Sequence, residues 1–432
     1  SRSLNHAQAA TSMGPEPNLV SDPWIPVRCV DGSRRIIAPW QMAEPGIETP
    51  DWPRPDLNIA CLELLIGLVY LADPPADIED WDRRAAPDPA RLRDRLAAFA
   101  PAFNLLGDGP LFMQDLEVLT GEANPPDMLF IDSAGANTAR NNADLMVRRN
   151  RYPALDPALA AMALYTFQTF APAGGAGNRT SMRGGGPLVT LVDPGQGLWP
   201  LVWANVPYGH PAVPDNLPWM RPTRASDKGL ETLPPDGALF GPEAFFGMPR
   251  RLRLMTGATH VTGVIQKPYG ANYALWKHPL SPYYRLKPGT ELLPKHPRAG
   301  RFGYRNWLGI LARESKNDLA ELSFSLREWG RGAARRAGAG SGGRRGARGR
   351  AGGVLHRHRG PLCRASGGAA RGGRPALRLA GRSAGAGAEA VRCAGRAGDR
   401  PARDRPDPAH RGCAQVPWPR LCRAWQAGES DL

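Results

Sequence analysis

The amino-acid composition changes abruptly after Trp329, and this change limits what the chain can fold into. Of the 102 residues from 331 to 432, 65 are Arg, Gly or Ala, while Phe, Tyr, Met, Ile, Asn and Lys are absent. Such a segment has too little apolar surface to offset the conformational entropy lost on folding. We therefore predict a flexible leader over 1–18, a folded domain over 19–330 and a disordered, low-complexity basic tail over 331–432.

Two explanations fit this tail. Arg- and Gly-rich tails bind RNA through phosphate charge, but they usually interleave Phe or Tyr for stacking, and this one contains neither. A shift of reading frame in G+C-rich coding DNA would also yield Arg, Gly, Ala and Pro. We favour the frameshift, because these six residue types are the ones whose codons are poor in G and C.

The tail also accounts for the charge of the whole chain, which is formally +15. It holds 22 Arg and 6 acidic residues, whereas residues 1–330 hold 33 basic and 34 acidic residues. Any nucleic-acid binding by the folded part must therefore rest on local patches. The six cysteines form no C-x-x-C motif, and the apolar run 59–72 is shorter than the roughly 20 residues that a membrane span needs. We predict a cytoplasmic protein without membrane contacts.

The folded part predicts a mixed α+β domain. Alternating apolar residues around Asp31-Gly32 indicate a hairpin with a tight primed turn. Asp88-Pro89 and Asp156-Pro157 are helix-start signals, because Asp caps the first turn and Pro fits into it. The helices expected are 57–72, 88–100, 156–170 and 303–312, and the strands expected are PLVTLV, LWPLVWANV and RRLRLM.

No motif in the folded part predicts catalysis or metal binding. The motifs G-x-x-x-x-G-K-[ST] and H-E-x-x-H are absent, and no His/Cys set has zinc spacing. His260, His278 and His296 stand alone. The acidic residues between 73 and 80 lie in a Pro-containing loop, which predicts a solvated surface. We expect a binding protein without a cofactor rather than an enzyme.

The segment APAGGAGNRTSMRGGGP, residues 171–187, is the first candidate binding site, and we call it the glycine loop. Without a Cβ, glycine lets the backbone approach a phosphate or a minor-groove edge closely. Arginines add charge, and asparagine adds a donor and an acceptor. The alternative to a binding site is that this loop is an ordinary flexible connector. The candidate DNA contacts are Gly174, Gly175, Gly177, Asn178, Arg179 and Arg183.

A second candidate is the Asn- and Arg-rich segment 129–153, which has the composition of a polar loop that orders on nucleic acid. A solvated linker is the equally plausible alternative.

Five collinear motifs over residues 17–330 resemble the large subunit (CasA) family of the type I-E CRISPR Cascade complex. They are DPWIPV, FID-x-x-GANT-x-x-NNADL, the glycine loop with its flanking helix and strand, NYALWKHPLSPYY and RFGYRNWLGIL. The resemblance implies a non-enzymatic subunit of an antiviral ribonucleoprotein complex, which recognises the protospacer-adjacent motif (PAM) on double-stranded DNA. It also implies help in duplex opening and recruitment of a helicase-nuclease. The alternative is an RG-tail RNA-binding protein unrelated to CRISPR.

The resemblance also implies roles for particular residues. Ala173 to Gly177 match the loop that approaches the PAM minor groove in the family. Phe130, Ile131 and Asp132, with Asn137, match the loop that reaches the crRNA 5′ end and the neighbouring backbone subunits. Lys267 is the candidate for the lysine with which the family approaches DNA. The family's C-terminal four-helix bundle and its duplex-splitting wedge fall where this chain has its Arg/Gly/Ala tail.

Overall fold

The computed structural model describes residues 16–133, 150–235 without 173 and 176, 240–297, 306, 310, 319–339, 353–356, 362–367 and 376–380. The helices are α1 (Pro55–Ala72), α2 (Ile78–Arg83), α3 (Pro89–Ala97), α5 (Pro157–Thr169), α6 (Leu198–Trp203), α7 (Glu243–Phe246) and α9 (Phe324–Ala339). The strands are β1 (Ile25–Cys29), β2 (Arg34–Ile37), β3 (Ile47–Pro50), β4 (Val189–Asp193), β5 (Arg251–Thr256), β6 (Val261–Lys267), β7 (Tyr283–Tyr284), β8 (Leu293–Pro294), β9 (Ala320–Glu321), β10 (Gly353–His356), β11 (Leu362–Gly367) and β12 (Ala376–Ala380). The predicted α+β class is therefore confirmed.

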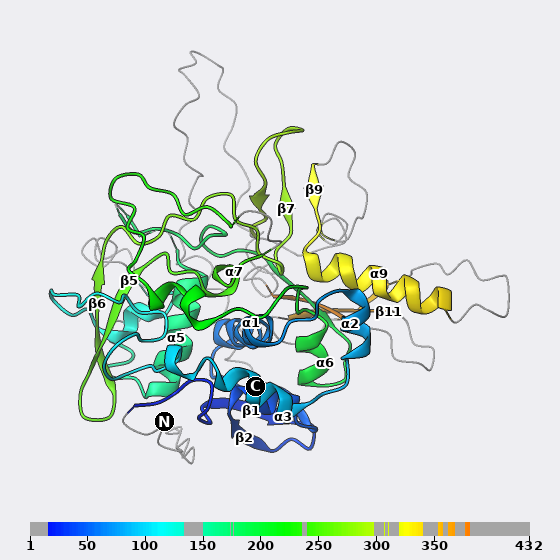
Figure 1. The fold of residues 1–432 in the computed structure, drawn as a ribbon, viewed down its shortest axis with the longest axis horizontal. Helices are drawn as coiled ribbons and strands as arrows, with labels where there is room; N and C mark the ends of the chain where they lie inside the picture. Colours follow the sequence, from blue (N-terminus) through cyan, green and yellow to red (C-terminus); the bar gives the residue numbers. More distant parts are fainter. Residues whose placement is uncertain are drawn as a thin grey trace, which may run out of the picture.

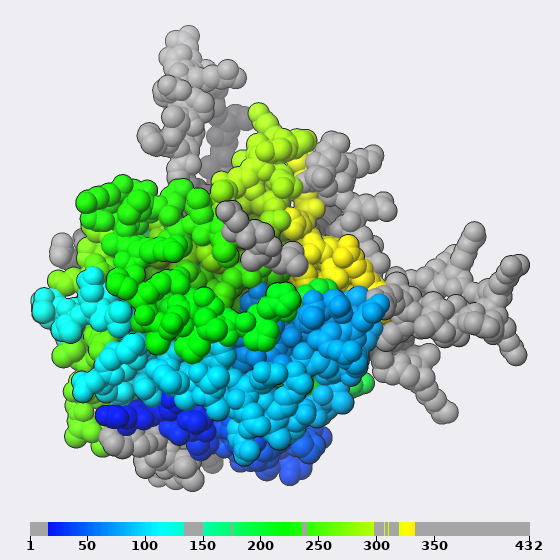
Figure 2. All heavy atoms as spheres, viewed as in Figure 1, coloured from blue at the N-terminus to red at the C-terminus, as the bar shows by residue number. Residues whose placement is uncertain are grey.

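Helix α1 lies at the centre of the fold, with α5 packed against it (Figure 1). By length and composition alone α1 could cross a membrane, but 78% of it is buried inside the molecule, as in a core helix. In the space-filling view the middle of the chain, in green, lies on the N-terminal third, in blue and cyan (Figure 2). Long-range bonds join these parts: Trp81 and Trp203 each donate an indole N–H to the other's backbone carbonyl, at 2.8 and 3.0 Å.

The sheets are small and antiparallel. Their strand orders are β2-β1-β3, β5-β6, β8-β7-β9 and β10-β11-β12-β4. The hairpin predicted around Asp31-Gly32 is confirmed, but the prediction of a tight primed turn is wrong. Gly32 has a φ of 85°, whereas Asp31 has no positive φ, and four residues link β1 to β2. The Cys29 amide donates to the Ser33 carbonyl at 2.8 Å, so only residues 30–32 form the loop, and three-residue loops combine an ordinary turn with a left-handed glycine.

Both Asp-Pro signals begin helices as predicted. The Asp88 carboxylate accepts from the Arg91 amide at 2.9 Å, and the Asp156 carboxylate accepts from the Leu159 amide at 2.9 Å. The strands predicted at PLVTLV and RRLRLM are confirmed as β4 and β5, and LNIACLELLIGLVYLA is confirmed within α1.

One strand prediction is wrong, because LWPLVWANV contains the helix α6. The Asn205 side chain donates to the carbonyls of Val192 and Leu201, both at 2.7 Å, and thereby fastens the end of this helix to β4. The helix predicted over 303–312 lies outside the described residues except for 306 and 310.

Within the predicted tail, the structure describes the end of α9 and the strands β10 to β12. Strand β12 pairs with β4 through backbone groups, which every non-proline residue supplies. The disorder predicted for the tail as a whole stays a prediction. The other residues of 331–432 lie outside the described part of the chain.

Candidate nucleic-acid interface

The glycine loop leads from α5 to β4, between a helix and a strand as predicted. Gln168, fully buried in the last turn of α5, fixes the entry to the loop. Its Nε2 donates to the carbonyls of Met113 at 3.1 Å and Arg250 at 2.9 Å, and its Oε1 accepts from the Arg250 amide at 3.1 Å. The last turn of α5, which leads into the glycine loop, is therefore fixed to Arg250, the residue just before β5.

Arg250 bridges the two sides of the loop, and it was not identified from the sequence. Its Nε donates to the carbonyl of Arg179 at 2.6 Å, and its Nη2 donates to the carbonyl of Pro172 at 2.5 Å. The guanidinium carbon lies 5.2 Å from the centre of the Phe167 ring. Arg250 is only 4% exposed, and no carboxylate among the described residues forms an ion pair with it. Burial lowers the pKa of Arg250 to about 10, so it stays charged at neutral pH.

The loop's tip is folded by the side chain of Asn178. Its side-chain Nδ2 donates to the carbonyl of Gly174 at 2.8 Å, and its backbone N–H donates to the carbonyl of Gly175 at 3.1 Å. Its Oδ1 accepts from Gln266 of β6 at 2.7 Å. Asn178 was predicted to contact DNA with its amide, but these bonds use both ends of that amide to shape the tip. Gly174 and Gly175 are exposed, whereas Ala173 and Ala176 lie outside the described residues.

Gly177 and Arg179 attach the far side of the tip. Gly177 has a φ of 77°, and its carbonyl accepts from the Tyr269 amide at 2.7 Å. Arg179 is partly exposed, and its Nε and Nη2 donate to the hydroxyl and the carbonyl of Ser226 at 2.8 and 3.0 Å. Both residues therefore support the loop, and their predicted contact with DNA stays a prediction.

Arg183 lies in the core, so its prediction as a DNA contact is wrong. It is 1% exposed and pairs with Glu63 of α1, with 2.6 Å between Nη2 and Oε1 and 3.2 Å between Nη1 and Oε2. Burial alone would raise the pKa of Glu63, but the charge of Arg183 holds it below its usual value. Burial, followed by that same charge, lowers the pKa of His278 beside the pair to about 4. His278 is therefore neutral at physiological pH.

The segment predicted to reach the crRNA begins on a fixed base. Phe130 is buried and stacks on Tyr152 with 4.4 Å between the ring centres, and Ile131 is buried as well. Asp132 binds Arg54 and Arg151, with 3.2 and 2.8 Å between the paired atoms. Burial would raise the pKa of Asp132, but hydrogen bonds from Arg151 and the charge of Arg54 lower it to about 2.

Phe130 and Ile131 thus anchor the start of that segment and do not present a contact surface. Asn137 lies outside the described residues.

Lys267 ends β6 beside the glycine loop. The residues on either side of it touch the loop: Gln266 donates to Asn178, and a Cβ on Gly177 would come within 2.7 Å of Pro268. The structure therefore brings Lys267 to the flank of the tip, although 89 positions separate it from Asn178 in the sequence. Its contact with DNA stays a prediction.

The solvated surface predicted for the acidic cluster at 73–80 is confirmed for Asp77 and Glu79, which are exposed, and wrong for the other two carboxylates. Asp73 and Asp80 are buried, and arginines neutralise them: Arg84 binds both, at 2.5 and 3.1 Å, and Arg91 binds Asp73 at 2.7 Å. Asp77 caps α2. In the part of the chain that the structure describes, no group of three His, Cys, Asp or Glu side chains could hold a metal ion.

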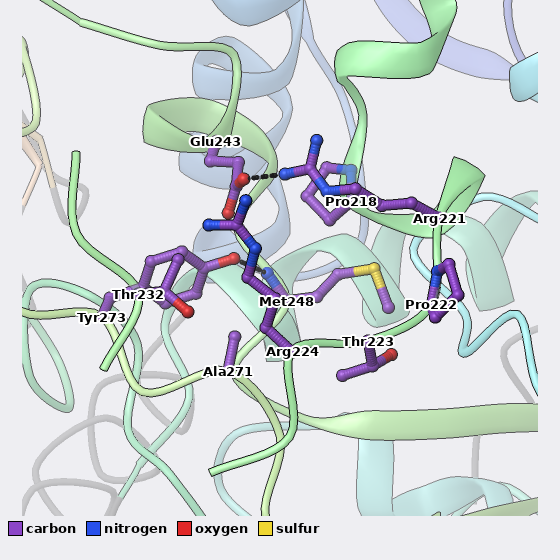
Figure 3. Close-up of a pocket in the computed structure, with 10 residues that line it drawn as sticks. All are labelled: Pro218, Arg221, Pro222, Thr223, Arg224, Thr232, Glu243, Met248, Ala271 and Tyr273. Carbon is purple, nitrogen blue, oxygen red and sulfur yellow. Dashed lines mark hydrogen bonds and ion pairs between the residues drawn. The ribbon is translucent and has the colours of Figure 1, made fainter. Parts of the chain in front are cut away.

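A small pocket is lined by residues between 218 and 273, and Figure 3 shows its side chains. Arg221 pairs with Glu243 at one end, and the Tyr273 hydroxyl accepts from the Met248 amide at 2.9 Å. Burial raises the pKa of Tyr273, which keeps the phenol neutral. None of the lining residues is His, Cys, Ser or Lys. They are Pro218, Arg221, Pro222, Thr223, Arg224, Thr232, Glu243, Met248, Ala271 and Tyr273.

Solved structures of CRISPR-associated proteins share this fold, including the following three. The CasA (Cse1) structure from Thermus thermophilus is 21% identical with a TM-score of 0.55, and the match covers 76% of this chain and 67% of that one. Cse1 from Thermobifida fusca is 21% identical with a TM-score of 0.55, and 76% and 68% are covered. A chain of a CRISPR RNA-guided surveillance complex is 16% identical with a TM-score of 0.55, and 72% and 68% are covered. This chain thus spans about two thirds of the length of the structures it matches.

The family model of the CRISPR-associated protein Cse1 matches residues 18–376, which is most of the chain and extends beyond the domain boundary predicted at residue 330. This match overturns the alternative of an RNA-binding protein unrelated to CRISPR and confirms the predicted family. The chain belongs to the Cse1 family of CRISPR-associated proteins.

Proposed function

We propose that this chain is a non-catalytic subunit of an RNA-guided surveillance complex and that its glycine loop reads the protospacer-adjacent motif on double-stranded DNA. One observation carries the proposal: the exposed Gly174–Gly175 tip lies next to Arg250, a buried cation that has no acidic partner among the described residues. The membership of the Cse1 family supports it, as does the likeness to a chain of a surveillance complex.

The chemistry of the tip suits a short motif read from the minor groove. Glycines allow the backbone to approach base edges, and the charge of Arg250 attracts the phosphates on either side. The minor groove distinguishes A·T from G·C pairs but little else, so several related motifs should be accepted. In this division of labour the guide RNA reads the long target, while the protein reads a short duplex element and starts its opening.

The partners of this subunit follow from the same proposal. The segment anchored by Phe130, Ile131 and Asp132 would reach the crRNA-containing subunits, and Lys267 would meet a phosphate beside the motif. A helicase-nuclease would be recruited to the assembled complex, which we expect in the cytoplasm.

We further propose that the reading frame shifts within residues 331–432, so that the end of the chain replaces the family's helical bundle. A chain with this tail should then be impaired in duplex opening and in nuclease recruitment, even where the motif is bound. Translation of the coding DNA in its other two frames tests the proposal: a frame that yields amphipathic helices supports it, and two frames without them contradict it. Interference at the level of a relative with an intact bundle would also contradict it.

The motif proposal is tested by assembling the guide-RNA complex with and without this subunit and selecting duplex targets with a randomised flank. We expect a few related flanks to be enriched only when the subunit is present. Substitution of Gly174, Gly175 and Gly177 together by bulky residues should abolish the enrichment. Selection that ignores the flank, or that is equal without the subunit, would show that the loop does not read a motif.

A further inference from the structure

We propose that Arg250 is the positioning residue of the glycine loop, and that Gly175, not Gly174 or Gly177, is the glycine that faces the DNA. The assignment to Gly175 rests on the function proposed above. The attachment of the loop by Arg250 is a property of the free protein and can be tested without DNA.

Arg250 joins the two ends of the tip. The carbonyls of Pro172 and Arg179 lie on either side of it, and a single guanidinium donates to both. The Gln168 side chain binds both the backbone N–H and the backbone C=O of Arg250. Arg250 is therefore itself fixed to α5. The planar fork of arginine suits two separate acceptors, whereas a lysine ammonium acts as a single point charge.

The surroundings of the three tip glycines differ. A Cβ on Gly174 would lie 2.8 Å from Nη2 of Arg250 and 2.8 Å from the Cβ of Asn178, so the folded loop itself requires this glycine. A Cβ on Gly177 would lie 2.7 Å from the Cβ of Pro268, so this position is also enclosed. Among the described residues, a Cβ on Gly175 would meet no heavy atom within 4 Å. Gly175 therefore leaves free the space that a ligand could enter.

The first test follows cleavage of the free full-length chain by trypsin, detected by the mass of the fragment that ends at Arg179. Because Arg250 binds the carbonyl of Arg179, we expect Arg250→Met and Arg250→Lys to be cleaved there about tenfold faster than wild type. Arg253→Met is the matched control, since Arg253 lies on the same strand but donates to the carbonyl of Asp115. Wild-type resistance in either Arg250 variant would overturn the positioning role.

The second test separates the glycines. Asn tolerates a positive φ, so Gly175→Asn should keep the wild-type trypsin rate at Arg179 while flank selection by the assembled complex falls about tenfold or more. Gly174→Ala should instead raise the trypsin rate of the free protein. Unchanged flank selection by Gly175→Asn would overturn the assignment of Gly175. If the wild type itself selects no flank, the proposed function fails, while the trypsin result for Arg250 still stands.

Discussion

Two buried arginines hold the glycine loop, and they differ in how their charge is balanced. Arg183 belongs to the loop and reaches into the core, where the Glu63 carboxylate neutralises it. Arg250 comes from outside the loop; its guanidinium donates to two backbone carbonyls, and it pairs with no carboxylate of the described residues. A neutralised buried pair contributes no net charge to its surroundings, whereas a lone buried cation does. The difference teaches that one arginine fixes the loop to the core, while the other also leaves positive charge where DNA would bind.

The largest expected effect on the free energy of unfolding comes from removing the carboxylate that neutralises Arg183. Glu63→Gln leaves a fully buried guanidinium without its counter-charge, which should lower the free energy of unfolding by about 3–5 kcal/mol. Denaturant unfolding measures this effect. Glu48→Gln is the control, because Glu48 forms an exposed pair with Arg28 and should cost less than about 1 kcal/mol. Equal losses in the two variants would show that burial does not distinguish these pairs.

The next effect concerns Asp132, which balances Arg54 and Arg151. Its folded-state pKa of about 2 lies below the ordinary value of 3.8, so its contribution is present above pH 4 and is lost as the pH falls towards 2. By linkage this contribution amounts to about 2 kcal/mol. Unfolding of the wild type and of Asp132→Asn, followed from pH 5 to pH 2, should show the difference between them shrinking by that amount. A constant difference would contradict the depressed pKa.

Removal of the unbalanced arginine should cost much less. Arg250→Met loses two hydrogen bonds to carbonyls but also removes a charge from a poorly solvated site, so we expect a stability change of only about 1 kcal/mol. The same unfolding assay measures it, beside Glu63→Gln. A loss as large as that of Glu63→Gln would remove the contrast between the two arginines.

The smallest effect on stability is expected at Lys267, which is partly exposed at the end of β6. Lys267→Ala should leave the free energy of unfolding unchanged. It should lower the salt dependence of DNA binding by about one phosphate contact, seen as a slope about 1 unit smaller in a plot of log affinity against log salt. Lys277→Ala is the control, because Lys277 pairs with Glu321. An unchanged slope would exclude Lys267 from the interface.

Local signals in the sequence predicted the elements that depend on local chemistry. The Asp-Pro pairs at 88–89 and 156–157 begin helices because the cap and the first turn lie within three residues. The placement of the glycine loop followed from the helix and the strand beside it. These elements needed no knowledge of distant partners.

The errors arose where a distant partner decides the outcome. Arg183 resembled a solvent-facing cation because Glu63, which buries it, lies 120 positions earlier. The apolar and aromatic run of α6 resembled a strand because the bonds that hold Trp203 come from Trp81, 122 positions away. Arg250 gave no signal at all, since its acceptors are backbone carbonyls, which no sequence pattern marks. Spatial proximity of this kind could have been found only from the fold or from covarying positions.

The attachment of the loop by Arg250 also bears on how motif preference could diversify. The guanidinium donates to the main-chain oxygens of Pro172 and Arg179. The side chains at those two positions could therefore change without loss of these hydrogen bonds. Gly174 is the exception, since a methyl group there would displace the guanidinium. Under the function proposed above, Gly175 could change to a residue that tolerates a positive φ while this frame stays constant, so that adaptation to an altered flank would need one substitution in place of a rebuilt domain.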